Sequence, residues 1–173
     1  MADEIASLKK VIRDCGFNIN DSNIRIVVEH SRNEIRDLNE RAMFYAHLIH
    51  ETAGLNVLEE GRATRDLYGP NFHGRGFIHL THEDNYRAAS QGLGYGNKFV
   101  DNPDLVAQPK YAIETAIWFW ETQVRRSGSF RTFDQTTLAI NGGYEANLNG
   151  AQPQARYNYY QRVARELDRK SVV

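Results

Sequence analysis

Two glutamates nine positions apart are the side chains in this sequence best suited to acid/base chemistry. Glu51 follows a stretch, Ala42 to Ile49, that is apolar except for His47. Such a stretch is typical of a helix buried on all sides, and a carboxylate at its end is partly shielded from water, which favours the protonated form. Glu60, with its neighbour Glu59, comes from a segment expected to be wetter. One carboxylate of each kind is the minimum set for acid/base hydrolysis of a glycosidic bond.

A metal site is the main alternative use of these residues. His50 and Glu51 match the start of the zinc-protease motif H-E-x-x-H, but that motif needs a histidine at position 54, where this sequence has Gly54. His47 and His50 share a helix face, and two core histidines are the more common reason for such a pair. The sequence also lacks Cys-x-x-Cys and nucleotide-binding glycine motifs. We therefore expect no metal and no organic cofactor.

Residues suited to carbohydrate recognition follow the acidic pair. The segment from Tyr68 to Tyr86 contains glycines, aromatic rings and the polar side chains of Thr81 and Asn85. Asn141-Gly-Gly adds an amide in a tight turn, although a simple helix C-cap explains that triplet equally well. Sugars are recognised by flat apolar faces together with fixed hydrogen-bond donors and acceptors. This set predicts a polysaccharide partner.

The overall composition narrows the function further. A formal net charge of −1 argues against a nucleic-acid-binding surface. No apolar run approaches the ~20 residues needed to cross a bilayer, so no membrane insertion is expected. The first residues lack the apolar core of a signal peptide, which predicts cytoplasmic synthesis and action on a cell wall or in the periplasm after release or delivery. Cys15 is alone, so no intrachain disulfide is possible.

The pattern of apolar residues predicts a mainly α fold. Without repeats or linkers, residues 1–173 are expected to form a single domain, and we expect a monomer. Two helical lobes around a substrate cleft, with at most one small β-hairpin near residues 55–80, would let the loop-borne residues converge. Residues 77–80 are expected to be a short strand or extended piece, and residues 81–84 to cap a helix. Helices are predicted over about 2–15, from 21, 37–51, 81–90, 109–124, 132–140 and 152–168.

Five segments, in order along the chain, resemble family 19 glycoside hydrolases, which comprise chitinases and related phage endolysins. None of the five would suffice alone. They are Phe44–Gly54 (FYAHLIHETAG), Gly74–Tyr86 (GRGFIHLTHEDNY), Asn102–Trp120, Ala139–Gly143 (AINGG) and Arg156–Tyr160 (RYNYY). The resemblance implies a lysozyme-like α+β fold and an inverting mechanism.

The resemblance also implies roles for the acidic residues. Glu51 matches the general acid, and Glu60 matches the general base, with Glu59 as the competing assignment. An arginine beside the base would keep it ionised. The sequence leaves three arginines open for that position, namely Arg62, Arg65 and Arg75.

Other positions match the hydroxyl and amide residues of the family. Thr81 corresponds to the residue that helps hold the attacking water. Histidine stands at position 79, where glutamine is usual, and Asp84 stands where an aromatic is common, which puts the choice of substrate in question. Residues expected to contact the substrate are His50, Tyr68, His79, Asn85, Asn141 and Arg156.

The expected substrate is a β-1,4-linked N-acetylhexosamine polymer. Peptidoglycan is placed first, because a disulfide-free domain without a signal sequence fits an antimicrobial endolysin or an injected effector. Chitin is the alternative within the same chemistry. A catalytically silent carbohydrate-binding protein is a further alternative, but a pure binder needs neither glutamate. A helical interaction module would leave an apolar face exposed, and the apolar stripes here fit one core.

Overall fold

Helices account for most of the structure. The computed structural model describes residues 1–61, 65–67, 71–126, 128, 130–141 and 148–171. Of these, residues 169–171 are described by their backbone alone. The α-helices are α1 (Ala2–Asp14), α2 (Asp21–Glu34), α3 (Leu38–Glu51), α5 (Glu83–Gly92), α6 (Lys98–Asp101), α7 (Pro109–Phe119), α8 (Phe133–Asn141) and α9 (Ala151–Ser171). A 3₁₀ helix, Pro103–Ala107, precedes α7, and a π-helical turn, Trp120–Arg125, follows α7 directly.

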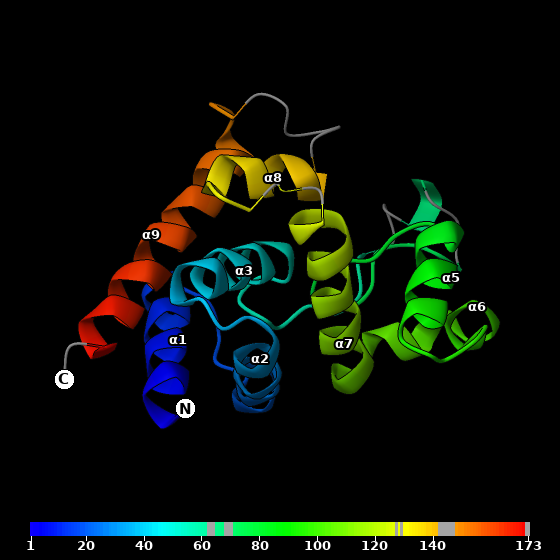
Figure 1. Ribbon diagram of the computed structural model, residues 1–173, viewed down its shortest axis with the longest axis horizontal. Coiled ribbons are helices and arrows are strands. Elements are labelled where there is room, and N and C mark those ends of the chain that lie inside the picture. Colours follow the sequence, from blue (N-terminus) through cyan, green and yellow to red (C-terminus); the bar gives the residue numbers. More distant parts are fainter. Residues whose placement is uncertain (62–64, 68–70, 127, 129, 142–147, 172–173) are drawn as a thin grey trace.

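Helix α3 is the centre of the larger lobe. Every residue from Ala42 to Ile49 is buried, as the apolar sequence predicted. Helices α1, α2, α8 and α9 surround α3, and α9 lies along both α3 and α1 (Figure 1). Because α3 has no exposed side along this stretch, its last residue, Glu51, is held at a fixed place by the core.

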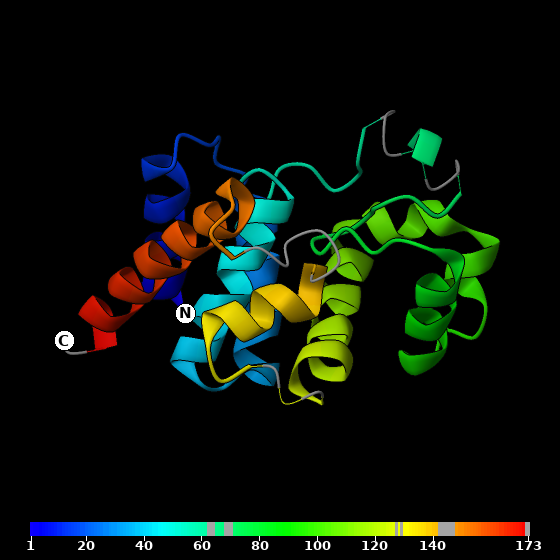
Figure 2. The ribbon, with the colours of Figure 1, turned by 90° about the horizontal axis from the view of Figure 1, so that it is seen from above.

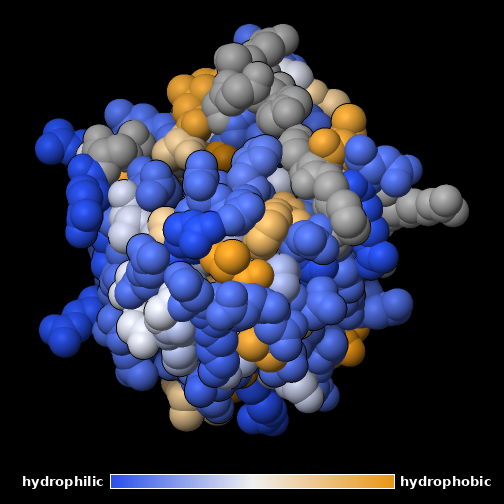
Figure 3. Space-filling model, turned by 90° about the vertical axis from the view of Figure 1, so that its right-hand side faces the viewer, coloured by the Kyte–Doolittle hydropathy of each residue, from blue (hydrophilic) through white to orange (hydrophobic). Residues whose placement is uncertain are grey.

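The smaller lobe contains α5 and α6. Helix α7 contacts α2 on one side and α5 on the other, so it joins the two lobes (Figures 1 and 2). The surface at the smaller lobe's end is mostly hydrophilic, with hydrophobic residues in small separate groups (Figure 3). The prediction of a mainly α fold with two lobes is confirmed. In the described part of the chain, no helix is long and apolar enough to span a membrane.

Side-chain caps begin two of the predicted helices. The Asp37 side chain accepts a hydrogen bond from the backbone N–H of Glu40 at 2.7 Å and begins α3. At α8, the Thr132 hydroxyl accepts from the Gln135 N–H at 3.3 Å, and the Gln135 side chain accepts from the Thr132 N–H at 3.2 Å. This reciprocal pair is a capping box, which satisfies backbone donors that the helix itself leaves free.

The segment between α3 and α5 differs from the prediction. Within its described residues, strand pairing is limited to isolated antiparallel bridges from Arg75 to Glu59 and to Leu80. Residues 77–79 form a turn rather than a strand. The cause is two residues with left-handed backbone, Gly76 at φ 81° and His79 at φ 48°, which reverse the chain.

Candidate functional site

A cleft of about 390 Å³ lies at the C-terminal ends of α3, α7 and α8, against the segment that precedes α5. This volume is within the range of small-ligand sites. Polar and apolar side chains share the lining, as sugar binding requires. The lining residues are Glu51, Glu60, Leu67, Ile78, His79, Leu80, Thr81, His82, Asn85, Phe119, Ile140 and Asn141.

Glu51 is fixed at the end of α3 by a buried arginine from α9. Arg156 is 1% exposed, and its Nη2 donates to Glu51 Oε1 at 2.5 Å. The Glu51 side chain is 17% exposed, so it is mostly shielded but reaches the cleft. A charge-assisted bond of this length fixes one carboxylate oxygen and leaves the other, Oε2, toward the cleft.

A buried histidine supports Arg156 from behind. The Nδ1 atom of His47 accepts from Arg156 Nη1 at 3.4 Å, and Nε2 donates to the Thr136 hydroxyl at 2.7 Å, because that hydroxyl in turn donates to the Phe133 carbonyl. Burial lowers the pKa of His47 well below its usual value, and the positive charge of Arg156 adds to this effect. His47 is therefore neutral and acts as an acceptor. The prediction that it is a core residue agrees with this position.

Glu60 forms two hydrogen bonds with the backbone of Gly74. Its N–H donates to the Gly74 carbonyl at 2.9 Å, and its Oε2 accepts from the Gly74 N–H at 3.0 Å. A Cβ at Gly74 would lie 2.2 Å from that oxygen, so only glycine leaves room for the carboxylate. Glu60 is 26% exposed and lines the same cleft as Glu51.

Glu59, the neighbour of Glu60, has a different set of partners. Its Oε1 accepts from His73 Nε2 at 2.8 Å and from Arg65 at 2.9 Å, and Arg75 Nε lies 3.4 Å away. Burial raises the pKa of Glu59, but the His73 hydrogen bond and the charges of Arg75 and Arg65 outweigh it, so the pKa is lowered overall. Two of the three candidate arginines thus pair with Glu59. Arg62 lies outside the described residues.

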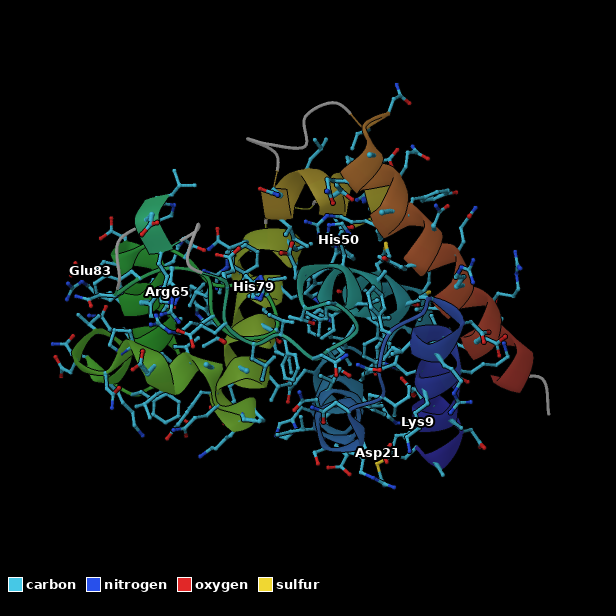
Figure 4. All side chains as sticks on the ribbon, turned by 180° about the vertical axis from the view of Figure 1, so that it is seen from behind. Lys9, Asp21, His50, Arg65, His79 and Glu83 are labelled. Carbon is cyan, nitrogen blue, oxygen red and sulfur yellow. The ribbon has the colours of Figure 1, made fainter. Side chains whose placement is uncertain are left out.

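The His79 ring lies close to both cleft carboxylates. Its Nδ1 is 3.8 Å from Glu51 Oε2 and 3.7 Å from Glu60 Oε1. Those two oxygens are therefore separated by at most the sum of these distances. That limit admits the separation of about 6.5–9.5 Å found in inverting glycosidases and also the shorter one of about 5–5.5 Å found in retaining enzymes. Figure 4 shows His50, His79 and Arg65 in this order from the larger lobe toward the smaller one.

Hydroxyl and amide groups complete the cleft. The Thr81 hydroxyl donates to the His79 carbonyl at 2.8 Å, which leaves its oxygen able to accept a further hydrogen bond. The Asn85 side chain donates to the Thr81 carbonyl at 2.8 Å. Asn141 reaches the cleft from the end of α8. Thr81 does not cap α5: the N-cap residue is His82, without a side-chain bond, because a left-handed backbone at φ 73° turns the chain there.

Two described residues predicted to contact substrate, His50 and Arg156, are absent from the cleft lining. Arg156 is 1% exposed and bonds to Glu51 from within the larger lobe. The His50 ring is directed to the Tyr159 ring of α9, with centroids 6.1 Å apart, and His50 is absent from the described cleft lining. Neighbouring positions on a helix point about 100° apart, which explains why Glu51 enters the cleft while His50 does not. Tyr68 lies outside the described residues.

Sequence reasoning missed several contributors to the site. The apolar lining residues Phe119 and Ile140 fall within predicted helices and were not singled out, and neither was His73. Gly74 was noted only as the first residue of the Gly74–Tyr86 segment, although the order Gly-Arg-Gly next to a polar loop signals close backbone approach. Among the described residues, no group of three or more His, Cys, Asp or Glu could hold a metal ion.

Known proteins resemble this chain in sequence. The family model described as chitinase class I matches residues 45–133, just over half of the chain. The acidic endochitinase pcht28 of Solanum chilense is 33% identical over 155 residues, covering 75% of this chain and 61% of the relative. Endochitinase A of Zea mays is 32% identical over 151 residues, covering 80% and 53%. The chain thus spans less than two thirds of the length of these curated relatives.

Solved structures show the same architecture. Chitinase C from Streptomyces griseus HUT6037 aligns with a TM-score of 0.76 at 25% identity, covering 94% of this chain and 75% of that one. The family GH19, class IV chitinase from Zea mays aligns with a TM-score of 0.67 at 26% identity, covering 88% and 82%. The family model, the curated relatives and the shared fold lead to one assignment. The chain belongs to the chitinase class I family, glycoside hydrolase family 19.

Proposed function

We propose that this chain is an inverting glycosidase that hydrolyses β-1,4 linkages in chitin or chito-oligosaccharides. The observation that carries the proposal is the placement of Glu51 and Glu60, which line the same cleft from two different segments of the chain while Glu59 is paired elsewhere. The cleft also offers apolar faces at Phe119 and Ile140 and amides that suit the N-acetyl groups.

In this mechanism the two carboxylates start in different protonation states. Protonated Glu51 gives its proton to the glycosidic oxygen as the bond to the anomeric carbon breaks. Ionised Glu60 takes a proton from a water that attacks that carbon from the opposite face. The water oxygen forms the new bond, so a β linkage yields an α reducing end. Thr81, whose oxygen can still accept a hydrogen bond, is placed to orient that water.

Chitin takes precedence over peptidoglycan in this proposal. The relatives that match this chain are named as endochitinases and chitinases, which supports the substrate that the sequence gave only as its alternative. Both polymers contain β-1,4-linked N-acetylhexosamines, so the same carboxylate chemistry applies to each. The difference between them is the lactyl-peptide substituent, which a cleft selective for chitin would exclude.

The test is hydrolysis of a chitin hexamer beside bacterial sacculi, with Glu51→Gln as the matched inactive control. Shortened oligomers whose new reducing ends are first seen as the α anomer by NMR would support the proposal. Clearing of sacculi with an intact hexamer would replace chitin by peptidoglycan. Measurable hexamer binding without any cleavage would overturn the catalytic assignment and favour a carbohydrate-binding protein.

A further inference from the structure

One peptide group connects Glu60 to the smaller lobe. The Gly74 N–H donates to Glu60 Oε2 at 3.0 Å, and the carbonyl of the same peptide, which belongs to His73, accepts from the Tyr86 hydroxyl at 2.7 Å. This peptide is trans, so it is planar and its C=O and N–H point in opposite directions. The two hydrogen bonds therefore hold one rigid unit from its two ends, with Glu60 on one side and Tyr86 on the other.

The direction of each hydrogen bond in this series is fixed by the groups that form it. The His73 carbonyl can only accept, so the single hydroxyl proton of Tyr86 is donated to it. The Arg75 guanidinium has only donors, so its Nη1 donates to the Tyr86 oxygen at 3.2 Å. Burial raises the pKa of Tyr86 to about 12, so the hydroxyl keeps its proton at neutral pH. The bonds run in one direction, from Arg75 through Tyr86 and the peptide to Glu60, and hydrogen bonds in such a series polarise one another.

Tyr86 and its partners are removed from solvent. Tyr86 is fully buried, and Arg75 is 2% exposed. The Tyr86 ring packs edge-on against Phe72 with ring centroids 5.3 Å apart, and the Arg75 guanidinium also donates to Asp104 at 2.7 Å. Tyr86 is absent from the described cleft lining, so its hydroxyl can influence a substrate in the cleft only through other residues.

The peptide needs support of this kind because a glycine follows it. Without a Cβ, Gly74 restricts rotation of the backbone less than any other residue, so local sterics leave the plane of this peptide poorly determined. A larger residue cannot supply the restraint, because a Cβ at Gly74 would lie 2.2 Å from the Glu60 carboxylate. A hydrogen bond from outside the segment, donated by Tyr86 of α5, supplies the restraint instead.

We propose that Tyr86 is a positioning residue for the general base. Its hydroxyl holds the peptide before Gly74 in the orientation that directs the Gly74 N–H at Glu60 Oε2. The inference rests on the proposed function in taking Glu60 as the base. With Oε2 held, Oε1 is the oxygen that takes the proton from the attacking water. Glu51 is fixed by Arg156 of the larger lobe, whereas this support of Glu60 comes from α5 of the smaller lobe (Figure 1).

Tyr86→Phe tests the proposal because it removes the hydroxyl and keeps the ring. Misplacing a reacting group by about 1 Å can cost about 10²-fold in rate, so kcat on a soluble chitin hexamer should fall by about ten- to a hundredfold. The KM should stay within about twofold of wild type, because the substitution removes no contact with the substrate. Thermal melts should show the variant folded. Wild-type-like kcat in folded Tyr86→Phe would overturn the proposal.

Tyr45→Phe is the matched control. Tyr45 is also fully buried, and its hydroxyl donates to Glu4 at 2.9 Å, outside the described cleft lining. Tyr45→Phe therefore loses a buried hydrogen bond of the same kind without any connection to Glu60, and it should keep the wild-type kcat. An equal loss of kcat in Tyr45→Phe and Tyr86→Phe would mean that lost stability explains both, which would contradict the proposal.

A double variant separates positioning of the base from a general structural effect. If Tyr86 acts through Glu60, adding Tyr86→Phe to Glu60→Gln should leave the residual kcat unchanged within about twofold, because effects that depend on one group are not additive. A structural role predicts that the double variant loses the full further factor seen for Tyr86→Phe alone. That result would contradict the proposal.

The Gly74 amide proton provides a measurement that needs no turnover. In ¹⁵N–¹H NMR spectra its resonance should move in Tyr86→Phe in the same direction as in Glu60→Gln, since each substitution weakens the bond that this N–H donates. The amide of Gly16, which donates to the Arg13 carbonyl, is the reference and should stay in place. An unmoved Gly74 resonance in Tyr86→Phe would overturn the proposal.

The wild-type protein decides the question even if Tyr86→Phe does not fold. Its Gly74 amide proton should be protected from exchange with solvent, because the peptide is held at both ends. Unprotected exchange at Gly74 would overturn the positioning proposal. Failure of the wild type to cleave the hexamer would instead contradict the proposed function, while exchange and resonance position at Gly74 would still test the role of Tyr86.

Discussion

Gly74 lies directly against the carboxylate of Glu60. The Gly74 N–H donates to Glu60 Oε2 at 3.0 Å, and a Cβ on Gly74 would lie 2.2 Å from the same oxygen. The carboxylate is therefore positioned by the absence of a side chain as much as by a hydrogen bond.

Gly74→Ala should displace the Glu60 carboxylate and leave the fold in place. Losing a positioned general base costs about 10²–10⁴-fold in rate, so we expect kcat on a chitin oligomer to fall by at least about a hundredfold. Gly61→Ala is the matched control, since a Cβ there meets nothing within 4 Å. Thermal melts should show both variants folded. Full activity in Gly74→Ala would show that the position of the Glu60 carboxylate does not depend on its contact with Gly74.

Glu59→Gln should affect stability more than rate. The substitution removes the charge that pairs with His73, Arg65 and Arg75. Breaking a buried pair costs about 3–5 kcal/mol, but the Glu59 side chain is 38% exposed and screened by solvent, so a loss of about 1–2 kcal/mol is expected in urea unfolding. The kcat should remain within about fivefold of wild type. A hundredfold loss of kcat with unchanged stability would instead make Glu59 the base.

The sequence was informative about α3 and uninformative about the choice between these two glutamates. A stretch that is apolar except for His47 is typical of a buried helix, so the position of Glu51 at the end of a core helix followed from composition. Adjacent residues of an extended chain point to opposite sides, which separates Glu59 from Glu60 but does not say which one faces the cleft. That direction depends on His73 and Arg75, which the chain brings back to the same place only when folded.

The position of His79 was also beyond the sequence. The sequence shows a histidine at position 79, but the direction of its side chain depends on a left-handed backbone that histidine rarely adopts. Conformational propensity therefore argues against the observed conformation. The prediction of a short strand or extended piece at residues 77–80 was wrong because left-handed backbone at Gly76 and His79 turns the chain there.

The buried His47 should make the fold sensitive to mild acid. Its folded-state pKa is lowered, whereas the unfolded chain binds a proton near pH 6.5. Below that pH the unfolded state therefore holds more protons, and the free energy of unfolding falls as the pH falls, by up to about 1.4 kcal/mol per pH unit from this group.

His47→Gln provides the comparison, because an amide can accept from Arg156 and donate to Thr136 without titrating. Urea unfolding between pH 7 and pH 5 should show a smaller loss of stability in the variant than in wild type. Parallel curves for the two proteins would mean that His47 is not the group responsible.

The most direct test of the account is kcat for Glu51→Gln and Glu60→Gln on a soluble chitin hexamer, with folding verified by thermal melts. Each variant should keep the fold and lose at least about a hundredfold in kcat, because each removes one partner of a proton transfer. Wild-type-like turnover in either folded variant would contradict the assignment of these two carboxylates as the acid and base of the cleft.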